Sequence, residues 1–176
     1  IDEGQRYRIG EVDFDGNDVV NDTGLIHIFE SIKPGEYYSE EDVRGGFEAA
    51  RELYGSLGYY EMTLFPDLQS RLGEAQETDV DANGNGDGSG LSVIDPRPTY
   101  IDGAPVVDVT IRVQEGDQYF VNRIVFVGNE TTHDQVIRRE LQLVERGVFN
   151  TEAMKYSVLR LNQLGYFEPL EESQVE

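Results

Sequence analysis

The sequence predicts an α+β fold built from two tandem β-α-α-β-β units, each with two antiparallel helices on a small mixed three-stranded sheet. The first observation is an internal repeat, because residues 3–17 reappear 112 positions later as residues 115–129 with six identities in fifteen positions. The second is hydrophobic periodicity, which passes from alternation to helical spacing and back within each copy. The third is the link at residues 115–118, which is too short for the units to tumble independently.

The first unit begins with alternation. Val12 and Phe14 alternate with acids over residues 11–15, which is typical of a half-buried strand, and Gly16-Asn17 ends it. Apolar residues at helical spacing then predict a first helix over residues 22–31. That helix is expected to stop before Pro34-Gly35, because proline cannot continue a helix and glycine tolerates positive φ.

A second helix follows Ser39, which resembles an N-terminal cap, and Gly58 ends it. Alternation over residues 60–64 predicts a strand that leaves this helix directly, and the clearest strand pattern covers residues 106–114. The apolar stripe of the helix consists of Val43, Phe47, Ala50, Tyr54 and Leu57.

The segment 71–104 is rich in Gly, Asp, Asn, Ser and Pro, and we interpret it as a mobile acidic hairpin loop. Part of it matches the early positions of a calcium loop, whose oxygen ligands here would be Asp79, Asp81, Asn83 and Asn85. Position 12 of that loop is Gly90 instead of the usual bidentate Glu, which favours a solvated linker. No other metal and no cofactor is predicted.

The second unit repeats the order of the first. Its predicted strands lie at Ile124 and Phe126 and at Gly165-Tyr166-Phe167, and Gly147 and Phe149 align with Gly35 and Tyr37. Its predicted helices are marked by Val136 or Ile137, Leu141 and Val144, and by Met154, Val158 and Leu161.

The domain boundaries follow from the repeat. Residues 1–5 match the close of the first unit, which occupies residues 6–117, and the second unit occupies residues 118–176 without its last strand. We therefore expect the chain to be a piece of a longer protein.

The net charge of −21 opposes binding to nucleic acid or to anionic membrane surfaces, and residues 1–114 carry 24 acids against 8 bases. Without cysteine, thiolate chemistry is excluded. His27 and His133 lie in the first helix region of each unit, without an acid placed beside them by sequence, and are interpreted as surface residues. Neither a nucleophile constellation nor a phosphate-binding glycine loop is present, so we expect a protein that is not an enzyme.

Taken together, the unit order and its short motifs resemble tandem POTRA domains of BamA-type outer-membrane protein assembly factors. The motifs are Gly-Asn after the first strand, Glu-Gly between units, and Leu-Gly followed by two aromatics after the second helix. They stand at Gly16-Asn17 and Gly128-Asn129, at Glu115-Gly116, and at residues 57–60 and 164–167. The second unit also carries residues 137–141 and 160–163 in the pattern of the family's final unit before a barrel.

This resemblance implies a periplasmic scaffold at the bacterial outer membrane that binds unfolded outer-membrane proteins and accessory outer-membrane lipoproteins, with a C-terminal barrel in the parent. One alternative is the POTRA region of a two-partner-secretion or translocation-and-assembly transporter. Another, from a different class, is a calcium-dependent interaction module built on residues 79–88.

Two sets of residues are candidates for partner binding. The strand at residues 59–65 is the candidate edge for an extended client, with Glu61, Thr63 and Phe65 facing away from the core, and a proline at Thr63 should abolish client crosslinking. Arg138 and Arg139 are the only adjacent bases. They either form ion pairs one turn apart on a solvated helix or dock the second unit against a barrel or an accessory protein.

Overall fold

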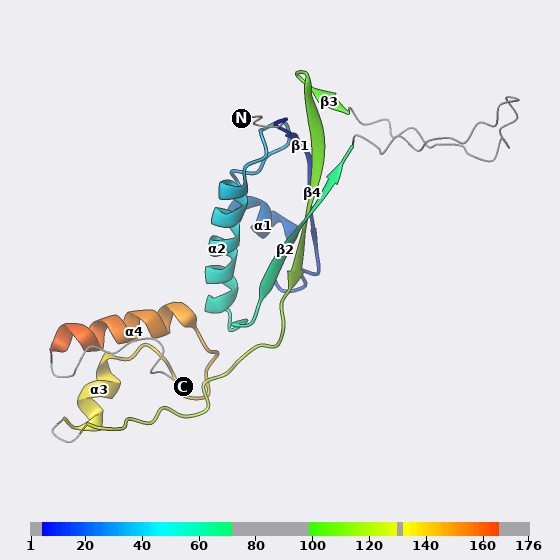
Figure 1. Ribbon diagram of the computed structural model, residues 1–176. Helices are drawn as coiled ribbons and strands as arrows, with labels where there is room; N and C mark the ends of the chain where they lie inside the picture. Colours follow the sequence, from blue (N-terminus) through cyan, green and yellow to red (C-terminus); the bar gives the residue numbers. More distant parts are fainter. Residues whose placement is uncertain (1–4, 72–98, 130–131, 166–176) are drawn as a thin grey trace, which may run out of the picture.

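The computed structural model describes residues 5–71, 99–129 and 132–165 of the chain. It confirms the α+β class and separates the chain into an upper unit with a sheet and a lower, mainly helical unit (Figure 1). Within the described ranges, no helix has the length and apolar character needed to cross a membrane.

The first unit contains a mixed sheet. Strands β1 (Arg8–Asp15), β4 (Ala104–Gln114) and β2 (Thr63–Ser70) lie in the order β1-β4-β2, with β1 parallel and β2 antiparallel to β4. The short β3 (Tyr100–Ile101) forms a hairpin with the start of β4. The central β4 is buried on both faces only near its start. Farther along, the side facing the helices is buried at Val109, Ile111 and Val113, and the other side is half-buried or exposed at Asp108, Thr110, Arg112 and Gln114.

Helices α1 (Asp22–Ile28) and α2 (Glu40–Ser56) cover one face of this sheet (Figure 1). The α2 cap is as predicted, because the Ser39 side chain accepts a hydrogen bond from the Asp42 N–H. The buried cluster between helices and sheet comprises Ile9, Leu25, Phe29, Ile32, Val43, Ala50, Tyr54, Met62, Val109, Ile111 and Val113.

Three sequence predictions for the first unit need correction. Helix α1 ends at Ile28 and not at residue 31, because the chain must turn after Phe29 to bury both Phe29 and Ile32. The strand predicted from residue 59 begins at Thr63, since Met62 first turns into the core. The last residues of the predicted loop 71–104 form an ordered hairpin instead, in which β3 pairs with the start of β4. Asp102 and Gly103, at its turn, both have positive φ.

The second unit contributes α3 (Asp134–Glu140) and α4 (Thr151–Leu164). The strand predicted around Ile124 and Phe126 is absent from the described residues, and the strand predicted at Tyr166-Phe167 lies outside them. In the first unit β1 pairs only with β4 among the named strands, and the described part of the second unit holds no counterpart of β4. Without that ladder, residues 120–127 form no strand and make one bridge, from Phe120 to Val148.

The repeat is confirmed by matching hydrogen bonds. The Asn17 side chain donates to the Val20 carbonyl at 2.9 Å and to Asp22 at 2.8 Å, and the Asn129 side chain donates to Thr132 at 3.0 Å and to Asp134 at 2.7 Å. The spacing of 112 residues therefore holds through the first helix of each unit. The asparagine of the Gly-Asn motif therefore fixes, by these hydrogen bonds, the turn from the first strand region to this helix.

Beyond the first helix the spacing becomes 111 residues. Ser39 and Asn150 are equivalent helix caps, and the bridge between Arg8 and Tyr37 corresponds to that between Phe120 and Val148. The alignment of Gly35 with Gly147 and of Tyr37 with Phe149 is thus wrong by one residue, because one residue is missing from the second unit after its first helix. Val144 accordingly lies at an exposed position outside α3, and Leu141 caps the end of that helix.

Candidate functional site

Strand β2 forms one end of the sheet, and among the described residues no strand pairs with its outer edge. Thr63 and Phe65 lie on the sheet face opposite the helices, in register with Gln114 and Arg112, and Phe65 is 49% exposed. Glu61 precedes the strand and is not part of it. The edge strand, predicted at residues 59–65, therefore covers residues 63–70, and of the three candidate client residues only Thr63 and Phe65 lie in it.

The hydrogen-bond register shows which main-chain groups of β2 face outward. The Arg71 N–H donates to the Val106 carbonyl at 3.0 Å, and these two residues lie directly opposite in the register of β2 and β4. Because facing pairs alternate in an antiparallel ladder, the odd-numbered residues of β2 bond to β4, whereas the main chains of Leu64, Pro66 and Leu68 face away from it. Pro66 is even-numbered, so its missing N–H leaves the β4 ladder intact.

This register also changes what a proline at position 63 would do. The Thr63 main chain faces β4, opposite Gln114. A proline there removes a hydrogen bond within the sheet and none from the free edge. The Thr63→Pro test suggested by sequence therefore measures damage to the fold, whereas Leu68, which faces outward, is the position for testing the edge.

The two units meet at the end of α2. The Tyr119 N–H donates to the Gly58 carbonyl at 2.9 Å, and the Gln118 amide donates to the Leu57 carbonyl at 2.9 Å. Gly58 has φ +92°, and a Cβ there would lie 2.6 Å from a Val148 methyl group. The close approach of the second unit therefore depends on glycine at this turn.

Aromatic rings also pack at this contact between the two units. The Tyr60 and Phe149 rings pack edge to face with centroids 6.0 Å apart. A hydrogen bond to Glu61 is the main cause of the raised pKa of Tyr119. Gly55 of α2 lies against Thr151, the first residue of α4. The Leu-Gly-Tyr-Tyr motif of the first unit is thus a contact surface for the second.

Glu115 holds the start of the linker. Its Oε1 atom accepts a hydrogen bond from the buried Tyr54 hydroxyl at 2.8 Å and one from the Val19 N–H at 2.9 Å. Burial, followed by this hydrogen bond, raises the pKa of Tyr54 well above its usual range, so the hydroxyl stays protonated as a donor. Glu115 thereby connects β4, α2 and the loop before α1 at the point where the chain leaves the first unit.

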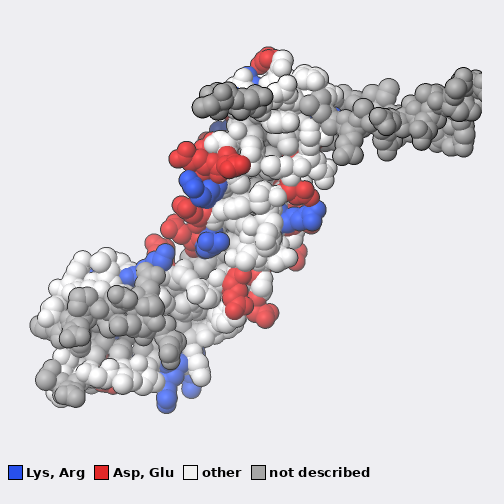
Figure 2. Space-filling model, in the orientation of Figure 1, with Lys and Arg blue, Asp and Glu red and all other residues white. Residues whose placement is uncertain are grey.

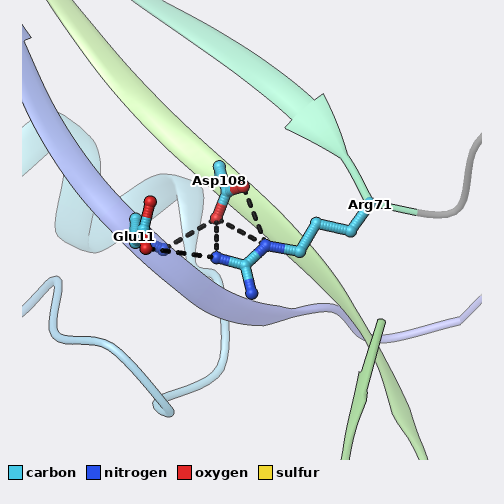
Figure 3. A network of polar contacts seen from close by, with 3 residues as sticks. All are labelled: Glu11, Arg71 and Asp108. Carbon is cyan, nitrogen blue, oxygen red and sulfur yellow. Dashed lines mark hydrogen bonds and ion pairs between the residues drawn. The ribbon is translucent and has the colours of Figure 1, made fainter. Parts of the chain in front are cut away.

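A partly buried ion pair between Arg71 and Asp108 lies on the face of the sheet opposite the helices (Figure 3). Arg71 donates to both carboxylate oxygens of Asp108, from Nε at 2.8 Å and from Nη2 at 2.7 Å, and Asp108 also accepts the Glu11 N–H at 2.8 Å. Gly10 lies at an irregularity in β1, and a Cβ there would overlap the Asp108 carboxylate. The pair therefore ties the ends of β2 and β4 to β1 and requires glycine at position 10.

Both ends of the segment between β2 and β3 attach to one residue of β4. Val106 accepts the Arg71 N–H and donates its own N–H to the Thr99 carbonyl, each at 3.0 Å. The calcium candidates Asp79, Asp81, Asn83 and Asn85 fall outside the described residues.

Arg138 makes contacts within the second unit. It donates to Glu145 at 3.0 Å and to the Ile124 carbonyl at 2.8 Å, and its guanidinium lies 5.2 Å from the centre of the Phe126 ring. The Ile124 N–H and then Arg138 lower the pKa of Glu145. Arg139 is 74% exposed in its side chain and contacts Glu140. Neither base pairs with a residue one turn away, and the Arg139 side chain is the more exposed of the two.

His27 and His133 are both exposed, and His133 caps α3 without a side-chain hydrogen bond. Among the described residues no group of three or more His, Cys, Asp or Glu side chains is placed to hold a metal ion. On the face seen in Figure 2, acidic and basic side chains both occur along the first unit.

The family model POTRA, described as surface antigen variable number repeat, matches residues 7–85 and 119–176. The chain is 22% identical over 97% of its length to the outer membrane protein assembly factor BamA of Nitratidesulfovibrio vulgaris, of which it covers 18%. It is 26% identical over 96% of its length to BamA of Neisseria meningitidis serogroup B, of which it covers 17%. The chain thus spans less than a fifth of these relatives.

Two solved structures have a similar fold. The crystal structure of Haemophilus influenzae BamA POTRA3-5 matches with a TM-score of 0.61 and 16% identity, over 95% of this chain and 53% of that one. The crystal structure of Haemophilus ducreyi BamA lacking POTRA domains 1-3 matches with a TM-score of 0.62 and 22% identity, over 94% of this chain and 25% of that one.

Proposed function

The chain belongs to the POTRA family, and on that premise we propose that it is a scaffold region of an outer-membrane β-barrel protein assembly machine. It acts at the periplasmic face of the bacterial outer membrane, ahead of a membrane barrel in the parent protein. There it binds unfolded outer-membrane proteins and accessory outer-membrane lipoproteins. The names of the relatives, which match nearly the whole chain, support this role.

The free edge of β2 is the observation that carries the proposal. A strand edge offers main-chain hydrogen bonds that do not depend on the side chains of the partner, which suits a protein that receives clients of many sequences. Leu64 and Leu68 flank the edge on one sheet face and Phe65 on the other, and Phe65 and Leu68 are 49% and 43% exposed. Apolar side chains on both faces favour an extended client in which apolar residues recur. The function is binding and handover, without covalent chemistry.

Arg139 is the candidate for docking an accessory lipoprotein or the barrel. Its side chain is 74% exposed, while Arg138 is held by Glu145 and Ile124. A charged residue at the rim of an interface mainly steers association. Charge reversal at Arg139 should therefore slow the association of an acidic partner surface and leave the fold unchanged.

Site-specific photo-crosslinking tests the function. A photo-reactive residue is placed at Phe65 on β2 or at Ile26 on α1, which is 56% exposed, and the chain is mixed with a urea-unfolded outer-membrane β-barrel protein diluted into buffer. Crosslinks should form at position 65 and not at position 26. Equal crosslinking at both positions would show general stickiness and would count against binding at the edge.

A further inference from the structure

We propose that Pro66 is a gate in the free edge of β2 that limits client segments to short, readily released pairings. This inference rests on the proposed function, because it concerns how the same edge selects and releases an extended chain. Pro66 lies in the middle of the eight-residue β2 strand and is exposed. Its carbonyl faces outward, but it offers no N–H to a partner strand.

The outward groups define what a client meets. Leu64 and Leu68 each present an N–H and a carbonyl to the free edge, and no described residue bonds to them. The two donors are four residues apart, or about 13 Å at the usual rise of a strand. Between them the pyrrolidine ring occupies the place of the donor. A client that spans the whole edge therefore loses one ladder hydrogen bond at its centre and must bend around the ring.

The gate leaves the protein's own sheet undisturbed. Phe65 and Asp67, on either side of Pro66, have main chains that face β4 and complete the ladder there. Proline at an outward position is a known device for preventing open sheet edges from pairing without limit. Pro66 thus lets the edge pair with an extended client and also limits the strength of that pairing, so that the client can be released.

The pattern of the edge also indicates the client. On the helix side of the sheet, Leu64, Pro66 and Leu68 form an apolar rim, while the opposite face has Phe65 and the ion pair between Asp67 and Arg112. A segment with apolar residues at alternate positions fits beside this rim. Short segments that pair beside Leu64 or beside Leu68 avoid the gap at Pro66, whereas longer uninterrupted strands do not.

The test compares three variants of the whole 176-residue chain. Pro66→Thr supplies the missing outward N–H, Leu68→Pro removes another, and Pro34→Thr makes the same chemical change as the first in an exposed turn away from β2. The probe is a fluorescein-labelled decapeptide in which valine alternates with threonine, and its Kd and dissociation rate are measured by fluorescence anisotropy. Thermal unfolding checks that each variant is folded.

We expect Pro66→Thr to bind the peptide about three- to tenfold more tightly, chiefly through slower dissociation, since one hydrogen bond is added. Leu68→Pro should weaken binding by a similar factor, and Pro34→Thr should match the wild type. Wild-type binding that Pro66→Thr leaves unchanged or weakens would overturn the gate while the proposed function stands. Binding by Pro66→Thr alone would support the gate and refute the wild-type edge as a client site. Absence of binding in every variant would overturn both.

Discussion

The two units share one repeat but differ in how they complete their packing. In the first unit, Phe29 packs against Gly46 of α2, so closely that a Cβ at position 46 would overlap the ring. At the equivalent place in the second unit, Ser157 is buried and its hydroxyl accepts the Gln142 N–H at 2.9 Å. The same helix position therefore packs against an aromatic ring in the first unit, where it is Gly46, and makes a hydrogen bond in the second, where it is Ser157. The comparison teaches that a repeat preserves the path of the chain more strictly than its contacts.

Helix length is a second difference. Helix α2 has 17 residues and α4 has 14, and the last turn of α2 carries Tyr54 and Gly55, which contact Glu115 and Thr151. The extra turn is therefore the part of the first unit that holds the linker and meets the second unit. These contacts between the units therefore depend on the additional turn of α2.

The largest expected effect comes from exchanging the shared position. Gly46→Ser, which copies the second unit, should destabilise the first by about 2–3 kcal/mol, because the new side chain displaces the Phe29 ring in a packed core. Urea unfolding followed by hydrogen exchange of α1 and α2 measures it. Unchanged exchange in both helices would show that the ring moves aside freely.

Removal of one hydroxyl tests the joint. Tyr54→Phe keeps the ring but leaves the Glu115 carboxylate without its buried donor, at a cost of about 1–2 kcal/mol. We also expect a broader distance distribution between spin labels on α1 and α4, measured by pulsed electron resonance. Tyr59→Phe is the matched control, because in the described part of the chain no hydrogen bond joins the Tyr59 hydroxyl to the linker. An unchanged distribution in Tyr54→Phe would mean that Gly58 and its partners suffice to hold the units.

Exchange of the first-helix caps should have opposite effects in the two units. Asn21 caps α1 by accepting the Gly24 N–H at 2.9 Å, whereas His133 in the same place makes no such bond. Asn21→Ala should cost about 1 kcal/mol, and His133→Asn should stabilise the second unit by up to about 1 kcal/mol. Hydrogen exchange at the first turns of α1 and α3 distinguishes them. A destabilised His133→Asn would contradict the equivalence.

The smallest expected effect concerns backbone strain. Arg146 has φ +65° where the first unit has Gly35 at +88°. Arg146→Gly should relieve the strain and stabilise the second unit by about 0.5–1 kcal/mol, partly offset by the greater freedom of glycine in the unfolded chain. Gly147→Ala is the control, since that glycine has no positive φ. Thermal unfolding of both variants decides whether position 146 or 147 is the strained one.

Several features were predictable because they depend on residues close together in the chain. The Ser39 cap and the start of α1 at Asp22 follow from local hydrogen bonding. The Asp102-Gly103 turn has a common hairpin signal, since this dipeptide stands between two short apolar runs. The long polar segment before it favoured a loop prediction for the whole of residues 71–104. The one-residue shift between the units was not predicted, because the sequence alignment paired Gly35 with Gly147, which lies next to the residue that adopts positive φ.

Other features required the assembled sheet. The sequence predicted the strands of the first unit and the repeat, because alternation and self-similarity can be recognised along the chain alone, and it proposed an edge near Thr63. Only the tertiary structure decided that Pro66 faces outward, that Glu115 meets Tyr54 and that Arg71 meets Asp108. Each of these depends on the register of strands or helices far apart in the chain, and a shift of one residue would reverse the facing of every group along β2.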